Sequence, residues 1–138
     1  MTANEKISQG YKKKEIRKQE SYQERSYAQK LLSKYRNILW RKMTLESVSD
    51  IDTNAIKECK KKIHFVQELV RKLQNEKNLG NRLYWVIFVT YMTVNEPNNI
   101  DEILSIIEKE YEHIPRRTYF WLRGRAIEIL DGYLTEMF

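Results

Sequence analysis

The stretch TNAIKECKKKIHFVQELVRKL, residues 53–73, carries the clearest pattern in the chain. Its apolar side chains are spaced alternately three and four residues apart, at Ile56, Cys59, Ile63, Val66, Val70 and Leu73. This spacing places them along one face of an α-helix, at the a and d positions of a heptad repeat. Because the repeat lasts only about three heptads, it predicts either a helical hairpin within one chain or a homodimer through residues 56–73.

Helical periodicity also precedes this stretch. Tyr27, Leu31, Tyr35, Ile38 and Leu39 share one face of a predicted helix that begins near residue 26, and the polar segment 44–53 connects the two helices.

After the stretch, Gly80 is expected to stop a helix, and Asn81 is a candidate cap for the next one. The run LYWVIFVTYM, residues 83–92, is apolar on every side. Its composition suits a strand, but a single strand has no partner in this sequence. We therefore expect a buried helix.

Turn residues fill 93–99, and Asn99 with Glu102 resembles a capping box for a helix over 100–111. Pro115 suits the first position of a last helix. These patterns together predict an all-α fold of about five helices. We expect one helical domain over 26–138, with a helix-turn-helix at about 99–134.

The residue inventory excludes several classes of protein. Cys59 is the sole cysteine, which rules out an intramolecular disulfide and a cluster of thiolate metal ligands. His64 and His113 are the only histidines, and four scattered glycines cannot form a phosphate-binding loop. We therefore expect no enzyme activity, no metal and no cofactor. Without an apolar signal segment or an apolar run of about 20 residues, we expect a cytoplasmic protein that does not contact a membrane.

The net charge of +6 is unevenly placed along the sequence. Residues 1–36 hold ten Lys or Arg and four Glu, whereas residues 37–138 hold fifteen basic and fifteen acidic residues. A basic arm over residues 1–25 favours binding to nucleic acid or another anionic surface. The candidate contacts in this arm are Lys12, Lys13, Lys14, Arg17 and Lys18. A solvated tail that aids solubility is the alternative.

The segment HIPRRTYFWLRGRAIEIL, residues 113–130, places four arginines among aromatic residues. On a wheel of 100° per residue, one face is apolar and predicts the core side: Tyr119, Leu122, Ala126, Ile129, Leu130 and Tyr133. The opposite face carries Arg117, Trp121, Gly124 and Glu128, flanked by Phe120 and bordered by Arg116, Arg123 and Arg125.

Two interpretations fit this outward face. In the first, it belongs to a recognition helix that enters the DNA major groove by its N-terminal end. The DNA contacts would then be Arg116, Arg117, Thr118, Phe120 and Trp121, with Arg123 and Arg125 beside them. In the second, the arginines form a solvated face, and Trp121 covers another helix or the N-terminal segment.

The stretch PRRTYFWLRGRAIEIL, residues 115–130, resembles the end of sigma-factor region 4, where a helix-turn-helix reads DNA. More of the chain resembles the ArpU family of phage-type late transcriptional regulators. The likeness lies in the order and spacing of YAQKLLSKYRNI (27–38), residues 53–73, RLYWVIFVTYM (82–92) and RTYFWLRGRAIEIL (117–130). Where the family pattern has a serine at the start of the recognition helix, this chain has Pro115.

This resemblance implies a DNA-binding transcriptional regulator of a phage or mobile genetic element, with double-stranded DNA as its partner. RNA polymerase or another host protein is a further candidate partner. Two alternatives remain open at this point. One is a small mobile-element protein that inhibits a host protein or nucleoprotein enzyme, with Trp121, Phe120 and Trp40 as anchors. The other is a DNA-packaging subunit similar to a small terminase.

Overall fold

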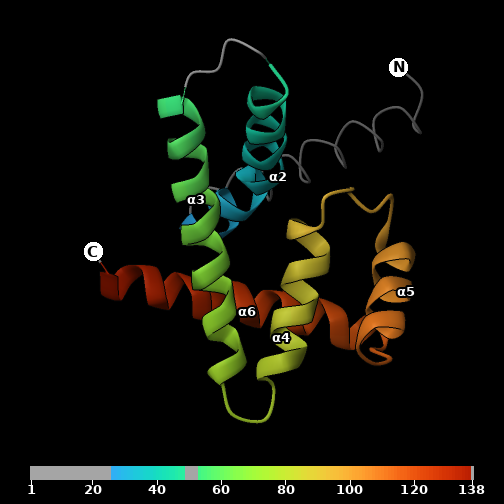
Figure 1. The fold of residues 1–138 in the computed structure, drawn as a ribbon. Helices are drawn as coiled ribbons and strands as arrows, with labels where there is room; N and C mark the ends of the chain where they lie inside the picture. The colour runs from blue at the N-terminus through green and yellow to red at the C-terminus, as the bar shows by residue number, and fades with distance from the viewer. Residues whose placement is uncertain (1–25, 49–52, 138) are drawn as a thin grey trace, which may run out of the picture.

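The computed structural model describes residues 26–48 and 53–137. All regular secondary structure in these two ranges is helical, which confirms the predicted all-α fold. Five α-helices, one 3₁₀ turn and one π-helical segment follow in chain order: α2 (Tyr27–Glu46), α3 (Thr53–Arg71), η1 (Lys72–Asn75), α4 (Gly80–Ile87), η2 (Phe88–Met92), α5 (Ile100–Glu110) and α6 (Arg116–Met137). Figure 1 shows α2 and α3 as an antiparallel pair, with α6 crossing behind the lower half of α3.

The heptad face of α3 packs inside the chain. Five of the six predicted positions are buried, and the first, Ile56, is partly buried. Helix α3 makes its main contact with α2, where the amide of Gln67 donates to the hydroxyl of Tyr35 at 3.1 Å. Of the two predicted alternatives for residues 56–73, the structure therefore has the helical hairpin within one chain. Because these side chains already contact the rest of the chain, they are not free to form a homodimer in this arrangement.

Helix α2 is fixed at its start by a contact with the far end of the chain. Ser26 caps α2 by accepting from the backbone N–H of Gln29 at 3.0 Å. The carboxylate of Asp131, on α6, accepts from the hydroxyl of Ser26 at 3.0 Å and from the N–H of Ala28 at 2.8 Å. We call these three bonds the Ser26–Asp131 clasp. A carboxylate at this position satisfies free N–H groups and complements the positive end of the helix dipole.

The apolar run over 83–92 is helical, as expected, but it changes type along its length. It continues from α4 into the π-helix η2. Within η2, the hydroxyl of Thr90 donates to the carbonyl of Val86 at 2.6 Å. The hydroxyl of the fully buried Tyr119 lies 2.9 Å from the hydroxyl oxygen of Thr90. Since the Thr90 proton is already used, Tyr119 is the donor, and this bond ties α6 to η2.

The end of η2 is also capped from another helix. Arg36, on α2, donates to the carbonyl of Thr93 at 2.9 Å, to the carbonyl of Val89 at 3.3 Å and to the Thr93 hydroxyl at 3.0 Å. Burial lowers the pKa of this guanidinium, and the nearby charge of Glu96 opposes that shift. A cation at the C-terminal end of a helix satisfies carbonyls that lack helical partners.

Gly80 does not stop a helix. It is the first residue of α4, and a Cβ added there would lie 2.5 Å from the carbonyl oxygen of Gln74. The preceding helical segment already ends at Asn75, and Asn78 takes the positive φ of 69° in the turn. A close approach of two backbone segments therefore explains this glycine.

The capping box predicted for α5 is present in modified form. The side chain of Asn99 accepts from the N–H of Glu102 at 2.8 Å, while the carboxylate of Glu102 accepts from the N–H of Asn98 at 3.0 Å. Residues 111–115 then lead to α6, whose first backbone hydrogen bond runs from the N–H of Tyr119 to the carbonyl of Pro115. Pro115 thus directly precedes the helix instead of forming its first residue.

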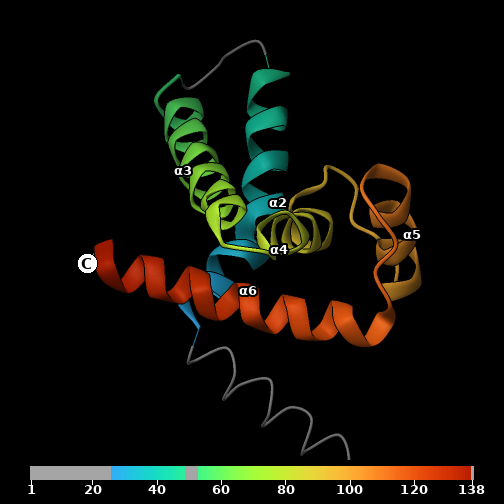
Figure 2. The same ribbon diagram turned by 90° about the horizontal axis from the view of Figure 1, so that it is seen from below.

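Helix α6 spans the width of the molecule, with α4 above its middle and α5 beside its N-terminal end (Figure 2). Its buried side chains are Tyr119, Leu122, Ala126, Ile127, Leu130 and Leu134. The wheel identified this face, although Ile127 and Leu134 lie deeper than the expected Ile129 and Tyr133, which are partly buried. Together with residues from the other four helices, they form one hydrophobic core.

Candidate nucleic-acid-binding surface

The outward face of α6 begins at the first turn of the helix. We define the α6 surface as the exposed residues Arg116, Arg117, Phe120, Trp121 and Arg125. Trp121 is 56% exposed and Phe120 is 42% exposed. Thr118 and Arg123, also predicted as contacts, are partly buried at its border. The structure therefore brings the seven predicted residues of this helix together along one end of α6.

Arg116 and Arg123 are held in place by neighbouring groups. Arg116 donates to the carboxylate of Asp101, on α5, at 2.9 Å, and both side chains are more than half exposed. Surface pairs of this kind contribute little to stability, so Arg116 remains available to another anion. Arg123 lies over the rings of Tyr119 and Phe120, with its Cζ atom 5.7 and 5.3 Å from their centroids.

Arg117 and Trp121 differ from these two residues. Among the described residues, neither has an ion pair, a hydrogen bond or a ring contact, apart from the helical backbone. Trp121 is more than half exposed, so most of its surface is not used to cover another described helix. An exposed tryptophan one turn from an unpaired arginine is a composition found where proteins bind partners.

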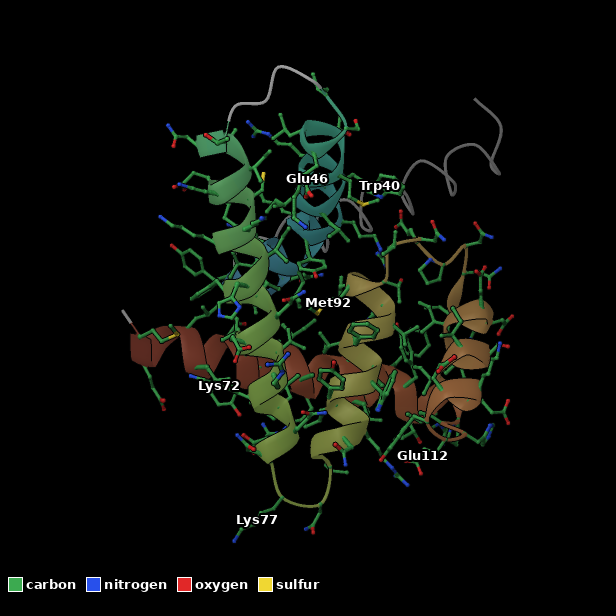
Figure 3. The ribbon with its side chains drawn as sticks, in the orientation of Figure 1. Trp40, Glu46, Lys72, Lys77, Met92 and Glu112 are labelled. Atoms are coloured by element: carbon green, nitrogen blue, oxygen red, sulfur yellow. The ribbon has the colours of Figure 1, made fainter. Side chains whose placement is uncertain are left out.

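The connection before α6 positions its first turn. Ile114 is buried and anchors the connection to the core. Glu112 accepts from Arg82, on α4, at 2.5 Å, and His113 lies 3.4 Å from Glu108. Figure 3 shows Glu112 at the base of α5, where this connection passes α4. The connection before α6 therefore has an apolar anchor in the core and polar contacts to α4 and α5.

Farther along α6, Tyr133 is tied to the turn after α3. Its hydroxyl donates to the carboxylate of Glu76 at 2.6 Å. Burial raises the pKa of Tyr133 to about 12, with the hydrogen bond and the charge of Glu76 adding to the effect. Lys72, labelled in Figure 3, lies over its ring at 5.9 Å. This half of α6 serves the fold and leaves the N-terminal half as the candidate surface.

Two groups of predicted residues stand apart from the α6 surface. Lys12, Lys13, Lys14, Arg17 and Lys18 lie outside the described residues. Trp40, the third anchor proposed for a host-protein inhibitor, is 47% exposed on α2 and points away from α3 (Figure 3). It lies on α2, whereas Trp121 lies on α6.

The net positive charge of the described residues is concentrated on α2 and α3. The described residues of α2 and α3, 27–48 and 53–71, hold ten basic and three acidic residues, a net charge of +7. Adding Asp50 and Asp52 of the connection gives +5. Residues 72–137 hold eight basic and ten acidic residues, a net charge of −2. Counting residues 37–138 as one neutral body hid this division, because the acids after residue 71 cancel the lysines of α3.

The described residues contain neither a group of three or more side chains that could hold a metal ion nor a helix long and apolar enough to cross a membrane. No family model, curated protein or solved structure matches the chain. The resemblance to the ArpU family therefore stays a prediction.

Proposed function

We propose that this protein binds double-stranded DNA through the α6 surface and acts as a transcriptional regulator. The observation that carries the proposal is the exposed Arg117, which has no ion-pair partner among the described residues, beside the exposed Trp121. Both lie at the start of a helix that follows α5 and a five-residue connection. The regulatory role, in a phage or mobile element, rests on the resemblance of residues 27–134 to the ArpU family of late transcriptional regulators.

The position of the arginines favours duplex DNA as the ligand. Arg116 and Arg117 occupy the first turn of α6, where free backbone N–H groups and the helix dipole add positive potential. Phosphate groups bind well at such ends. An arginine that projects from the end of a helix in the major groove can also donate two hydrogen bonds to a guanine. Phe120 and Trp121 can then contact sugars or thymine methyl groups.

The proposal is tested by selecting bound duplexes from a random-sequence pool at about physiological salt, where non-specific binding is weak. We expect an enriched sequence motif. On that motif, Arg117→Ala should weaken binding by roughly 1–3 kcal/mol, while other duplexes show a smaller loss. Lys77→Ala is the matched control, because Lys77 is an exposed cation in the turn before α4 and is not part of the α6 surface.

Three results are informative. An equal loss of affinity on every duplex would make Arg117 a phosphate contact. The same loss in Arg117→Ala and Lys77→Ala would remove the α6 surface from the interface. A selection that yields no motif, from protein whose folding is confirmed by circular dichroism, would contradict sequence-specific binding.

The exposed aromatic residues favour a second candidate function, binding to a host protein. Trp and Arg are the residue types that most often dominate protein–protein interfaces, and Trp121 and Arg117 lie one turn apart. In that case Trp121→Ala would abolish a protein complex whose affinity depends weakly on salt. Duplex binding depends steeply on salt, with a log–log slope of about −0.9 per neutralised phosphate.

A further inference from the structure

We infer that the α2–α3 hairpin carries a second nucleic-acid contact, a sequence-independent surface that binds the phosphate backbone of duplex DNA. The inference begins from the net charge of +7 on the described residues of this hairpin, against −2 on residues 72–137. It depends on the proposed function only for the choice of DNA as the ligand.

On α3 three of the four lysines form one stripe together with His64, and Lys62 lies outside it. Lys57, Lys60, Lys61 and His64 lie within about 100° of the helix circumference, on the side away from the buried heptad face. All four are exposed. Lys61 lies 3.7 Å from Glu58, with both side chains mostly in solvent. Lys57 and Lys60 have no partner among the described residues, so their charges are not neutralised within this part of the chain.

Helix α2 adds a second stripe. Lys30, Lys34 and Arg41 lie within about 40° of the circumference, opposite the buried Ala28 and Leu32. The three cations are exposed, and Lys34 and Arg41 have no acidic partner among the described residues. Helices α2 and α3 pack against each other (Figure 1), and each carries its stripe on the side away from its own buried residues.

The chemistry of this surface fits phosphate better than lipid. A helix that binds a membrane surface inserts an exposed apolar face beside its lysines. The apolar face of α3 is instead buried in the core, and none of the exposed large hydrophobic residues lies on α3. The exposed lysines of α3 therefore give a non-directional positive surface, which suits the regularly spaced charges of a nucleic-acid backbone. On α2 the exposed ring of Tyr27 lies 5.8 Å from the Lys30 ammonium, so the comparison with lipid rests on α3.

The hairpin surface is separate from the α6 surface. The outward side of α6 faces away from α2 and α4, because its other side packs on them. Figure 2 shows α6 along one edge of the molecule and α3 on another side. Substitutions on α3 can therefore change hairpin binding without altering the groups of the α6 surface.

The test is the salt dependence of binding to a random-sequence duplex of about 30 base pairs, measured by fluorescence anisotropy with the full chain. Lys57→Gln/Lys60→Gln should reduce the log–log slope by roughly 2, because each lysine that contacts a phosphate contributes about 0.9. Lys57→Arg/Lys60→Arg keeps both charges and should keep the slope. The control Lys77→Gln/Lys109→Gln removes two exposed cations outside the hairpin and should change the slope by much less.

Equal changes of slope in the two glutamine variants would overturn the inference, since net charge alone would then explain the effect. No change in the hairpin variant would also overturn it. So would a loss of binding to phosphatidylserine vesicles with duplex binding unchanged. Arg117→Ala, measured on the random-sequence duplex and on the selected motif, separates this inference from the proposed function. If Arg117→Ala loses its preference for the selected motif, the result supports the α6 surface. A reduced salt slope in the hairpin variant supports the hairpin surface even if the selection yields no motif.

Discussion

Gly124 and Gly132 offer a direct test of how α6 is divided between fold and surface. Both glycines lie inside α6, and a Cβ added at either position would meet nothing within 4 Å. Glycine inside a helix is less favourable than alanine by roughly 1 kcal/mol. Gly124→Ala and Gly132→Ala should therefore each raise the free energy of unfolding by roughly that amount, and by about twice that amount when combined.

The assay is urea denaturation followed by circular dichroism at 222 nm, because an unchanged m-value shows that only stability has changed. Lower stability in either alanine variant would refute the reasoning, since it would mean that the added methyl group meets an obstacle. Affinity for the selected duplex gives a second result. Gly124 lies one turn after Phe120 and Trp121, so weaker binding in Gly124→Ala alone would show that a partner approaches the backbone there.

Three further substitutions test the fold, each by the same denaturation experiment. Asp131→Ala removes two hydrogen bonds from the start of α2 and should cost roughly 2–4 kcal/mol, from the lost charged acceptor and the weakened cap. Gly80→Ala places a methyl group against the carbonyl of Gln74 and should cost roughly 1–3 kcal/mol. Tyr119→Phe loses the bond to Thr90 and should cost about 1 kcal/mol.

Asp131→Ala and Gly80→Ala each have a control variant, and Tyr119→Phe is compared with the natural chain. Glu128→Ala removes an exposed carboxylate of the same helix and should stay within about 0.5 kcal/mol of the natural chain. A matching loss in Asp131→Ala and Glu128→Ala would contradict the role given to the clasp. Asn78→Gly tests the turn before Gly80 and should be tolerated, because Asn78 already has a positive φ. Equal stability of Tyr119→Phe and the natural chain would show that the buried hydroxyl contributes nothing.

Much of the fold could be predicted because helices that pack together need apolar residues at regular spacing in the sequence. The heptad face of α3 and the core face of α6 were both readable from spacing alone, since a buried stripe must recur every three or four residues. The exposed Trp121 and Arg117 followed from the same wheel. Periodicity cannot say which helix covers a stripe, and for this reason the choice between hairpin and homodimer needed the structure.

The features that the sequence did not reveal depend on contacts between distant residues. Nothing local marks Asp131 as the acceptor at the start of α2, and Gly80 resembles a helix stop until the carbonyl of Gln74 is seen beside it. The basic hairpin was missed for a similar reason. Its charges lie on two helices that become neighbours only when α3 folds back on α2, whereas counting along the chain merges α3 with the acids that follow it.

The Ser26–Asp131 clasp joins residues 105 positions apart, whereas α2 and α3 are consecutive in the chain. The entropy lost in closing a loop grows with its length, and contacts between distant residues slow folding. We therefore expect the hairpin to assemble early and the docking of α6 to complete the transition. In kinetic terms, Asp131→Ala should mainly accelerate unfolding, while substitutions at Val66 or Leu32 should slow refolding. The basic surface on α2 and α3 would then exist before the arginine-bearing helix reaches its final place.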